Sequence, residues 1–252
     1  MKKWALVTGA TVGIGEAFTR LLASEGYNLI INARSLDALE ERAQSLRTSF
    51  GVEVEVLQAD LALECEKVEQ YIENHEIEVL VNNAGFGLNQ SFLASSREDE
   101  ERVLDVLVRA PMRLMHAVLP QMRKRDSGTI INVSSTAAFI AGGHYSAAKS
   151  YLTVMSESLY TQMLPTGVRI SSLNPGFVRT EFHQRAGMKM GAIPEIMWLD
   201  RDFLVKQAWR DARRGKAISI PGWQYKLLRA IIAIAPRSTV RKMGMSLRTK
   251  QR

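Results

Sequence analysis

An apolar segment, a glycine-rich turn and an amphipathic segment follow one another at the start of the chain. The apolar run at 4–8 leads directly into Thr8-Gly9-Ala10-Thr11-Val12-Gly13-Ile14-Gly15, and apolar residues then recur at helical spacing to about Gly26. Glycines permit a tight turn, and the free amides of a helix N-terminus attract a pyrophosphate. This order predicts a strand, a dinucleotide-binding turn and a helix, although the spacing of the first two glycines departs from G-x-G-x-x-G. A glycine loop that serves only packing is the alternative.

Predicted strands and helices alternate along the rest of the chain. Such alternation is typical of an α/β fold with a parallel, doubly wound sheet and helices on both faces. No repeat, low-complexity stretch or internal linker interrupts it, so the sequence predicts a single domain over 1–252. Further strands are predicted at 28–33, 52–57, 79–81, 129–133, 168–173 and 217–220, and helices at 36–50, at 97–125 with a bend at Pro111, and from Tyr145 onward.

Two charged residues follow the second and third predicted strands. The second strand ends in Arg34, and no acidic residue occurs before Asp37. In dinucleotide folds an acid near this point binds the ribose 2′-hydroxyl, whereas an arginine accommodates a 2′-phosphate. Arg34 therefore predicts NADP(H) rather than NAD, with a solvated arginine as the alternative. Asp60 follows the third strand; it accepts from an adenine amine or caps a helix from Ala62, and the sequence favours neither.

Small and polar residues mark the ends of the next three strands, where sheets of this kind bind ligands. Asn82-Asn83-Ala84-Gly85 follow the fourth strand, Ser134-Ser135 the fifth, and Asn174-Pro175-Gly176 the sixth. The amides can satisfy buried backbone and the glycine lets a cofactor ring pass close, although a turn alone explains them almost as well. The agreement of position among all these motifs indicates a ligand site more strongly than any one of them.

Tyr145-Ser146-Ala147-Ala148-Lys149 opens a predicted helix. Residues four apart lie on one helix face, so the Tyr145 hydroxyl and the Lys149 ammonium can lie close together. A phenol has a pKa of about 10, and a neighbouring cation lowers it. The pair then forms an acid that exchanges a proton near neutral pH. Two ordinary helix-surface residues are the alternative, which the preceding motifs disfavour.

In order and spacing, these motifs resemble those of the short-chain dehydrogenase/reductase family, over residues 4 to about 180 and a final strand near 217–220. The resemblance implies a seven-stranded parallel Rossmann sheet and a homodimer or homotetramer built partly on two long helices. It also implies hydride transfer between NAD(P)(H) and a carbonyl or alcohol carbon.

The resemblance assigns a role to each catalytic residue. Tyr145 is the acid in reduction and the base in oxidation, and Lys149 binds the nicotinamide ribose and lowers the Tyr145 pKa. Family members with a single serine at this point usually carry it at the position of Ser135, not Ser134. Ser135 is therefore expected to orient the substrate oxygen and to stabilise the charge that develops there. No metal is expected. Cofactor contacts are expected at Gly9, Thr11, Gly13, Ile14, Gly15, Arg34, Asp60, Leu61, Asn83, Ala84, Gly85, Tyr145, Lys149, Pro175, Gly176, Val178 and Thr180.

Two features depart from the family pattern. The connection from Ser135 to Tyr145 is about three residues shorter than is common, which tightens one wall of the pocket. The long helix usually carries an asparagine in a segment resembling Asp-x-Asn-x-x-Ala, and Leu107 takes that place in Asp105-Val106-Leu107-Val108-Arg109-Ala110. In the family this asparagine helps to hold a water that relays protons to the lysine, so proton resupply is expected to be slower or to take another route.

Two segments after the family motifs bear on substrate and partners. In the family the segment at about 181–198 forms a substrate lid, and its methionines and aromatic residues indicate a bulky hydrophobic substrate or ordinary core packing. The tail at about 224–252 is an apolar helix with basic flanks. This pattern fits a helix lying on anionic lipid, and it also fits an apolar face at a subunit interface with a solvated basic end, which the sequence favours.

Charge and composition limit the partners further. The net charge is +7, but eleven of the 33 Lys and Arg residues follow Asp211, the last acidic residue. The chain up to and including Asp211 therefore carries 22 basic and 26 acidic residues. The basic excess therefore belongs to the tail, which lacks interleaved aromatic residues, and nucleic acid is not expected as a partner.

A single cysteine, Cys65, excludes an intrachain disulfide. The N-terminus lacks a signal-peptide pattern, so a cytoplasmic protein, with membrane contact through the tail as an option, is expected.

The sequence thus predicts an NADP(H)-dependent oxidoreductase acting on a hydrophobic or lipid-like carbonyl or secondary alcohol. The alternative is an NADP-binding regulatory or scaffold protein with little turnover, which Leu107 and the basic tail motivate.

Overall fold

Seven parallel strands form the central sheet of the protein. The structure, a computed structural model, describes residues 3–88, 90–180 and 193–251. The strand order is β3-β2-β1-β4-β5-β6-β9, so the chain runs outward in both directions from the β1–β4 pair. The strands are β1 (Trp4–Thr8), β2 (Asn28–Ala33), β3 (Val54–Gln58), β4 (Ile77–Asn82), β5 (Gly128–Val133), β6 (Val168–Leu173) and β9 (Ile218–Ser219). The predicted doubly wound, seven-stranded sheet in a single Rossmann-like domain is confirmed.

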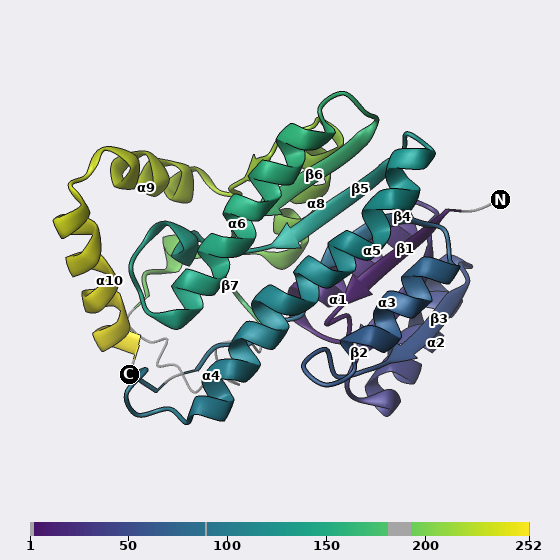
Figure 1. The fold of residues 1–252 in the computed structure, drawn as a ribbon, viewed down its shortest axis with the longest axis horizontal. Coiled ribbons are helices and arrows are strands. Elements are labelled where there is room, and N and C mark those ends of the chain that lie inside the picture. Colours follow the sequence, from purple (N-terminus) through teal and green to yellow (C-terminus); the bar gives the residue numbers. More distant parts are fainter. Residues whose placement is uncertain (1–2, 89, 181–192, 252) are drawn as a thin grey trace.

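Helices cover both faces of the sheet (Figure 1). Side chains alternate between the two faces of a strand, so Ala5 and Val7 of β1 pack with one helical layer and Leu6 with the other. The first layer consists of α1 (Gly13–Ser24), α2 (Leu36–Phe50) and α8 (Arg201–Arg213), and the second of α3 (Cys65–Asn74), α5 (Ala110–Lys124) and α6 (His144–Met163). Burial on both faces explains why the central strands β1, β2 and β4 are rich in apolar residues.

Several boundaries follow from local chemistry. The α2 helix has the predicted bounds because the Ser35 hydroxyl accepts from the Ala38 amide at its start and Gly51, with φ of 61°, ends it. The third strand begins at Val54, two residues later than predicted. The next helix begins at Cys65 and not at Ala62, because 61–63 form a turn.

The predicted long helix at 97–125 is continuous but changes its hydrogen-bond pattern. It consists of α4 (Arg97–Leu104), a π-helical turn η1 (Asp105–Arg109) and α5. Pro111 has no amide proton for the Leu107 carbonyl, which breaks the α-helical pattern at this point. The Ala110 amide instead donates to the Asp105 carbonyl, five residues back. The irregularity predicted at Pro111 therefore lies in the turn that precedes it.

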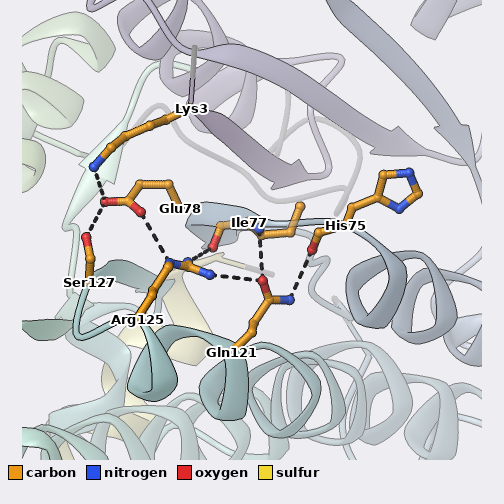
Figure 2. Close-up of polar contacts among 7 residues, drawn as sticks. All are labelled: Lys3, His75, Ile77, Glu78, Gln121, Arg125 and Ser127. Carbon is orange, nitrogen blue, oxygen red and sulfur yellow. Dashed lines mark hydrogen bonds and ion pairs between the residues drawn. The ribbon is translucent and has the colours of Figure 1, made fainter. Parts of the chain in front are cut away.

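A polar cluster fixes the end of the sheet opposite to the strands' carboxyl ends (Figure 2). The Glu78 carboxylate accepts from Lys3 (2.8 Å) and from the Ser127 hydroxyl (2.7 Å). Burial by itself would raise the pKa of Glu78, but these two hydrogen bonds and the nearby Arg125 hold it below its usual value. Gln121 of α5 accepts from the Ile77 amide at 3.1 Å, so the end of α5 is tied to the start of β4.

Short elements complete the carboxyl-terminal part of the chain. The strand β7 (Phe177–Val178) pairs with β8 (Trp198–Leu199). Two short helical turns are η2 (Thr136–Phe139) and η3 (Glu195–Met197). The last helices are α9 (Trp223–Ile234) and α10 (Arg237–Gln251). Residues 181–192 of the predicted lid at 181–198 lie outside the described residues. Within the described part of the chain, no helix is long and apolar enough to cross a membrane.

Candidate active site

A cleft of about 500 Å³ lies along the carboxyl ends of the strands. Residues that follow β1, β2, β3, β4, β5 and β6 line it, on both sides of the β1–β4 pair where the chain reverses its direction of winding. Open α/β sheets bind ligands at such a reversal. Arg34 follows β2 and Ser135 follows β5, so these two lie on opposite sides of the β1–β4 pair within the same cleft.

The cleft brings together most residues predicted from the sequence. Three of them, Thr11, Gly15 and Gly176, are not among the lining residues. A Cβ on Gly15 would lie 2.1 Å from the Gly9 carbonyl oxygen, and one on Gly176 would lie 1.8 Å from the Tyr225 ring, so both glycines permit close packing. The predicted residues that line the cleft are Gly9, Gly13, Ile14, Arg34, Asp60, Leu61, Asn83, Ala84, Gly85, Ser135, Tyr145, Lys149, Pro175, Val178 and Thr180.

The glycine turn after β1 is held by the residues that follow β4. Asn83 donates through its side-chain amide to the carbonyls of Thr8 (2.9 Å) and Gly9 (3.0 Å), and the Thr8 hydroxyl accepts from the amides of Asn83 and Ala84, each at 3.0 Å. Gly9 has φ of 63°, in the left-handed region that favours glycine. The Asn83 side chain thus satisfies buried backbone, one of the two roles expected for it.

The start of α1 offers an anion site to this cleft. The helix begins after Val12, whose side chain has no acceptor with which to cap it, and Val12, Gly13 and Ile14 all line the cleft. Free amides at a helix N-terminus carry partial positive charge and bind phosphate groups. Together with the turn at Gly9, this arrangement fits the pyrophosphate of a dinucleotide.

Asp60 is held by two partners at the Arg34 side of the cleft. Its carboxylate accepts from the Ala62 amide at 3.0 Å and pairs with the Arg102 guanidinium of α4. Burial raises the pKa of Asp60, but Ala62, Arg102 and the nearby Arg34 outweigh it and hold the pKa below its usual value. Asp60 therefore caps the 61–63 turn, not a helix, while it remains in the cleft wall as an ionised acceptor.

Tyr145, Ser135 and Lys149 meet at the other side of the cleft. The phenol of Tyr145 is hydrogen-bonded to the Ser135 hydroxyl. The Lys149 ammonium lies 5.7 Å from the centroid of the Tyr145 ring and donates to the Val133 carbonyl at 2.7 Å. The helix that carries both residues, α6, follows Gly143, whose φ of 101° turns the chain at the close of the short connection from Ser135.

The pKa shifts of this pair differ from the expectation. Burial raises the pKa of Tyr145 to about 12, against the lowering effect of its bond with Ser135. Burial also lowers the pKa of Lys149 to about 8. The expected lowering of the Tyr145 pKa by Lys149 is therefore not found in this structure, because the loss of hydration dominates. Lys149 is the group that titrates near neutral pH.

The two serines after β5 have different tasks. The Ser134 hydroxyl is buried and donates to the Lys149 carbonyl at 2.8 Å, so it anchors the backbone of α6. Ser135 faces Tyr145, and the Asn174 side chain fixes its backbone by donating to the Ser135 carbonyl at 3.1 Å. The geometry thus favours Ser135 over Ser134 as the residue that contacts a substrate oxygen.

Comparison with known proteins identifies the family. The family model described as short chain dehydrogenase matches residues 3–190, about three quarters of the chain. The chain belongs to the short-chain dehydrogenase/reductase family. The NADP-dependent 3-hydroxy acid dehydrogenase YdfG of Escherichia coli strain K12 is 36% identical over 186 residues, which cover 70% of this chain and 73% of the relative. The very-long-chain 3-oxoacyl-CoA reductase of Rattus norvegicus is 30% identical over 188 residues, covering 71% of this chain and 60% of the relative.

A solved structure supports the same assignment. A short-chain dehydrogenase from Sphingobium yanoikuyae in complex with NADPH is 29% identical, with a TM-score of 0.84, and the match covers 93% of this chain and 96% of that one. Family membership makes the present chain an oxidoreductase fold with a nicotinamide-cofactor site.

Leu107, which was predicted to take the place of the family asparagine, lies close to Lys149 in this short-chain dehydrogenase. A Cβ on Gly85 would lie 2.9 Å from Leu107 Cδ2 and 3.7 Å from Lys149 Nζ, so both side chains reach the same glycine. Leu107 is buried among Val103, Val106 and Ala148. The wall next to the Lys149 ammonium is therefore apolar where the family pattern has an amide.

We expect Leu107→Asn to retain or raise turnover. The new amide places a hydrogen-bonding group beside Lys149, where it can hold a water that returns protons. It also buries a polar group in an apolar cluster, so the free energy of unfolding is expected to fall by about 1–3 kcal/mol. Steady-state kinetics and thermal unfolding measure the two effects, with Leu107→Ala as a control that opens the wall without adding an amide. A large loss of turnover in folded Leu107→Asn would contradict this placement.

The cleft wall includes residues that the sequence did not single out. Phe86, Gly87 and Leu88 follow Gly85 directly and could have been inferred from their place at a strand end. Arg102 and Val106 come from the helix at 97–125, and only the packing of that helix places them in the wall. In the described residues, no group of three or more His, Cys, Asp or Glu side chains is placed to hold a metal ion.

Proposed function

We propose that this short-chain dehydrogenase is an NADP(H)-dependent reductase of a bulky hydrophobic ketone, or the dehydrogenase of the corresponding alcohol. One observation carries the proposal. A single cleft holds Arg34 at the side proposed for the nucleotide, and Ser135, Tyr145 and Lys149 at the side proposed for catalysis. The NADP dependence of the relative from Escherichia coli and the NADPH bound in the related Sphingobium protein support the cofactor. The long acyl substrate in the name of the rat relative supports a hydrophobic one.

Each residue of the site has a task in ketone reduction. When bound, the nicotinamide supplies the hydride that the carbonyl carbon receives. The Ser135 hydroxyl donates to the carbonyl oxygen and orients it, and Tyr145 donates its phenolic proton to that oxygen as charge develops there. With a pKa of about 12, Tyr145 stays protonated and competent as an acid throughout the physiological range. Lys149 contributes positive charge beneath the phenolate that remains.

The wall of the cleft favours an apolar substrate. Phe86, Leu88 and Val106 line it near the catalytic residues, and apolar walls with few polar groups are typical of sites for hydrophobic small molecules. Loss of NADPH absorbance in the presence of aliphatic, steroid-like and fatty-acyl ketones tests the proposed substrate class. Turnover confined to small polar carbonyls would refute it.

We expect kcat/KM for ketone reduction to fall as the pH rises above about 8. Burial lowers the pKa of Lys149 to about 8, so its charge is present below that pH and is lost above it. Tyr145, with a pKa of about 12, keeps its proton across the same range and does not contribute. A pH profile of kcat/KM measures the inflection, and Lys149→Arg, which keeps its charge, is expected to abolish it. A flat profile through pH 10 would contradict the assignment of the titrating group.

A second candidate function is a cofactor-binding protein with little turnover. The apolar wall that Leu107 forms beside Lys149 favours it, because that wall offers no hydrogen bond to a proton-relaying water. NADPH binding measured by fluorescence, combined with no Tyr145-dependent oxidation of NADPH across the ketone panel, would select this function over the first.

We further propose that the protein is a cytoplasmic homodimer or homotetramer. Exposed apolar side chains on the long helices support self-association, at Leu104 of α4 and at Tyr151 and Val154 of α6. Light scattering of the purified protein tests the oligomeric state.

A further inference from the structure

The helix α9 turns an apolar face away from the protein. Trp223, Leu227, Ile231 and Ile234 are 65%, 54%, 49% and 87% exposed, and their spacing places them on one side of the helix. We call these four residues the apolar α9 face. Large apolar residues gathered on an exposed helix face mark a docking surface, because isolated ones are common but a continuous stripe is not.

The opposite side of α9 is fixed to the body of the protein. Tyr225 is buried against Gly176, its hydroxyl accepts from the Phe177 amide at 2.8 Å, and it donates to the Met197 carbonyl. The Arg229 guanidinium lies 4.6 Å from the centroid of the Phe139 ring. These contacts hold the helix in one orientation, so the apolar α9 face is a feature of the folded protein.

Exposed basic residues occur on α9 and on the helix that follows it. Lys226 is exposed on α9 itself, and Arg237, Arg241 and Lys242 are exposed on α10. No acidic residue follows Asp211 in the sequence. In Figure 1, α9 and α10 lie together at the end of the molecule remote from β2 and β3. The same end of the protein therefore exposes both apolar side chains and positively charged ones.

This combination distinguishes a lipid surface from a second copy of the chain. A two-fold pairing of α9 helices would bring two surfaces of the same positive charge together, and like charges across an interface oppose association. An anionic bilayer accepts both features at once, because the apolar side chains enter the boundary between headgroups and acyl chains while the cations meet lipid charge. Trp223 suits that boundary, where tryptophan is enriched in membrane proteins.

We propose that the apolar α9 face, with Lys226, Arg237, Arg241 and Lys242, docks the protein on the surface of an anionic membrane. The docked helices adjoin the wall of the active site. A Cβ on Gly244 of α10 would lie 2.4 Å from the Ala141 carbonyl oxygen, so α10 packs closely on the connection between Ser135 and Tyr145. Where the substrate is the hydrophobic ketone of the proposed function, docking brings the site next to the phase in which such a ketone dissolves.

Flotation with vesicles tests the docking surface without any substrate. We expect the protein to float at low salt with vesicles of phosphatidylcholine that contain phosphatidylserine, and not with vesicles of phosphatidylcholine alone. Leu227→Gln/Ile234→Gln and, separately, Arg237→Gln/Arg241→Gln are each expected to weaken binding at least about tenfold. Leu63→Gln/Leu164→Gln removes two exposed leucines elsewhere and is expected to bind as the unaltered protein does. All four proteins are first shown to unfold at similar temperatures.

Three results would overturn the proposal. The first is no binding of the unaltered protein to anionic vesicles at low salt. The second is equal binding by the α9 variant, which would place the membrane contact elsewhere. The third is a change of oligomeric state in the α9 variant with vesicle binding retained, which would make the apolar α9 face an interface between copies. Turnover of a water-soluble ketone, measured in parallel without vesicles, reports separately on the reductase chemistry, so its failure leaves the flotation result intact.

Discussion

Tyr145→Phe is expected to lower kcat for ketone reduction by about 10²–10⁴-fold, the range that general acid catalysis contributes. The substitution removes one oxygen and leaves the ring in its place above Lys149. The carbonyl oxygen then receives no phenolic proton, while Ser135 still orients it. Affinity for NADPH is expected to change little, because the nucleotide side of the cleft is untouched. Stopped-flow and steady-state loss of NADPH absorbance measure turnover, and fluorescence titration measures binding.

Two variants control for this result. Tyr160→Phe removes a phenol from the same helix at a position that does not line the cleft, and it should leave kcat unchanged. Ser135→Ala should lower kcat less than Tyr145→Phe, since it removes an orienting hydrogen bond and not the proton donor. If Tyr145→Phe kept most of its turnover with the fold intact, another group would have to be the acid.

Arg34→Asp is expected to reverse the preference between the two nicotinamide cofactors. Arg34 is exposed beyond β2, where its guanidinium can meet a 2′-phosphate. A hydrogen bond to a charged group contributes about 1.5–3 kcal/mol, so its loss lowers NADPH affinity by about 10- to 150-fold, and the introduced carboxylate adds repulsion. NADH, which carries a ribose hydroxyl in that place, is expected to bind as well or better. Titration with both cofactors gives the ratio of the two dissociation constants.

A neutral variant separates the two contributions in this prediction. Arg34→Gln should lose the NADPH preference through the missing charge alone, without the gain in NADH affinity expected for Arg34→Asp. Substitution of Arg102 provides a further comparison. Because Arg102 pairs with Asp60, its loss is expected to change the affinities for NADPH and NADH by similar factors. Unchanged NADPH affinity in Arg34→Asp would assign the 2′-phosphate to other residues.

The fold was predictable wherever the local signals and the packing agree. The second strand, at 28–33, has its predicted bounds because its apolar residues are buried on both faces of the sheet. The sequence predicted an irregularity at Pro111 but not the π-helical turn η1. A helix can adjust to a missing amide proton at several positions, and tertiary packing decides which of them is used. The start of α3 was misplaced because Asp60 caps a turn as effectively as it would cap a helix.

The site was predictable as a set of positions, but not in its electrostatics. The carboxyl ends of parallel strands meet at one edge of the sheet, so residues far apart in sequence were expected to share one cleft, and most of them do. The direction of the Tyr145 shift was predicted wrongly, because a phenol and an ammonium four residues apart say nothing about how far both are buried. Arg102 carried no sequence signal, since its partner Asp60 is 42 residues away in the sequence.

Transfer of deuterium from NADPH labelled at C4 of the nicotinamide tests the central proposal most directly. The protein is mixed with the labelled cofactor and a panel of bulky hydrophobic ketones, and mass spectrometry locates the label in the products. The proposed mechanism predicts deuterium at the carbinol carbon with the unaltered protein and almost none with Tyr145→Phe, although both proteins bind the cofactor. Binding of NADPH with no label transferred to any ketone would contradict the reductase and would favour the cofactor-binding protein with little turnover.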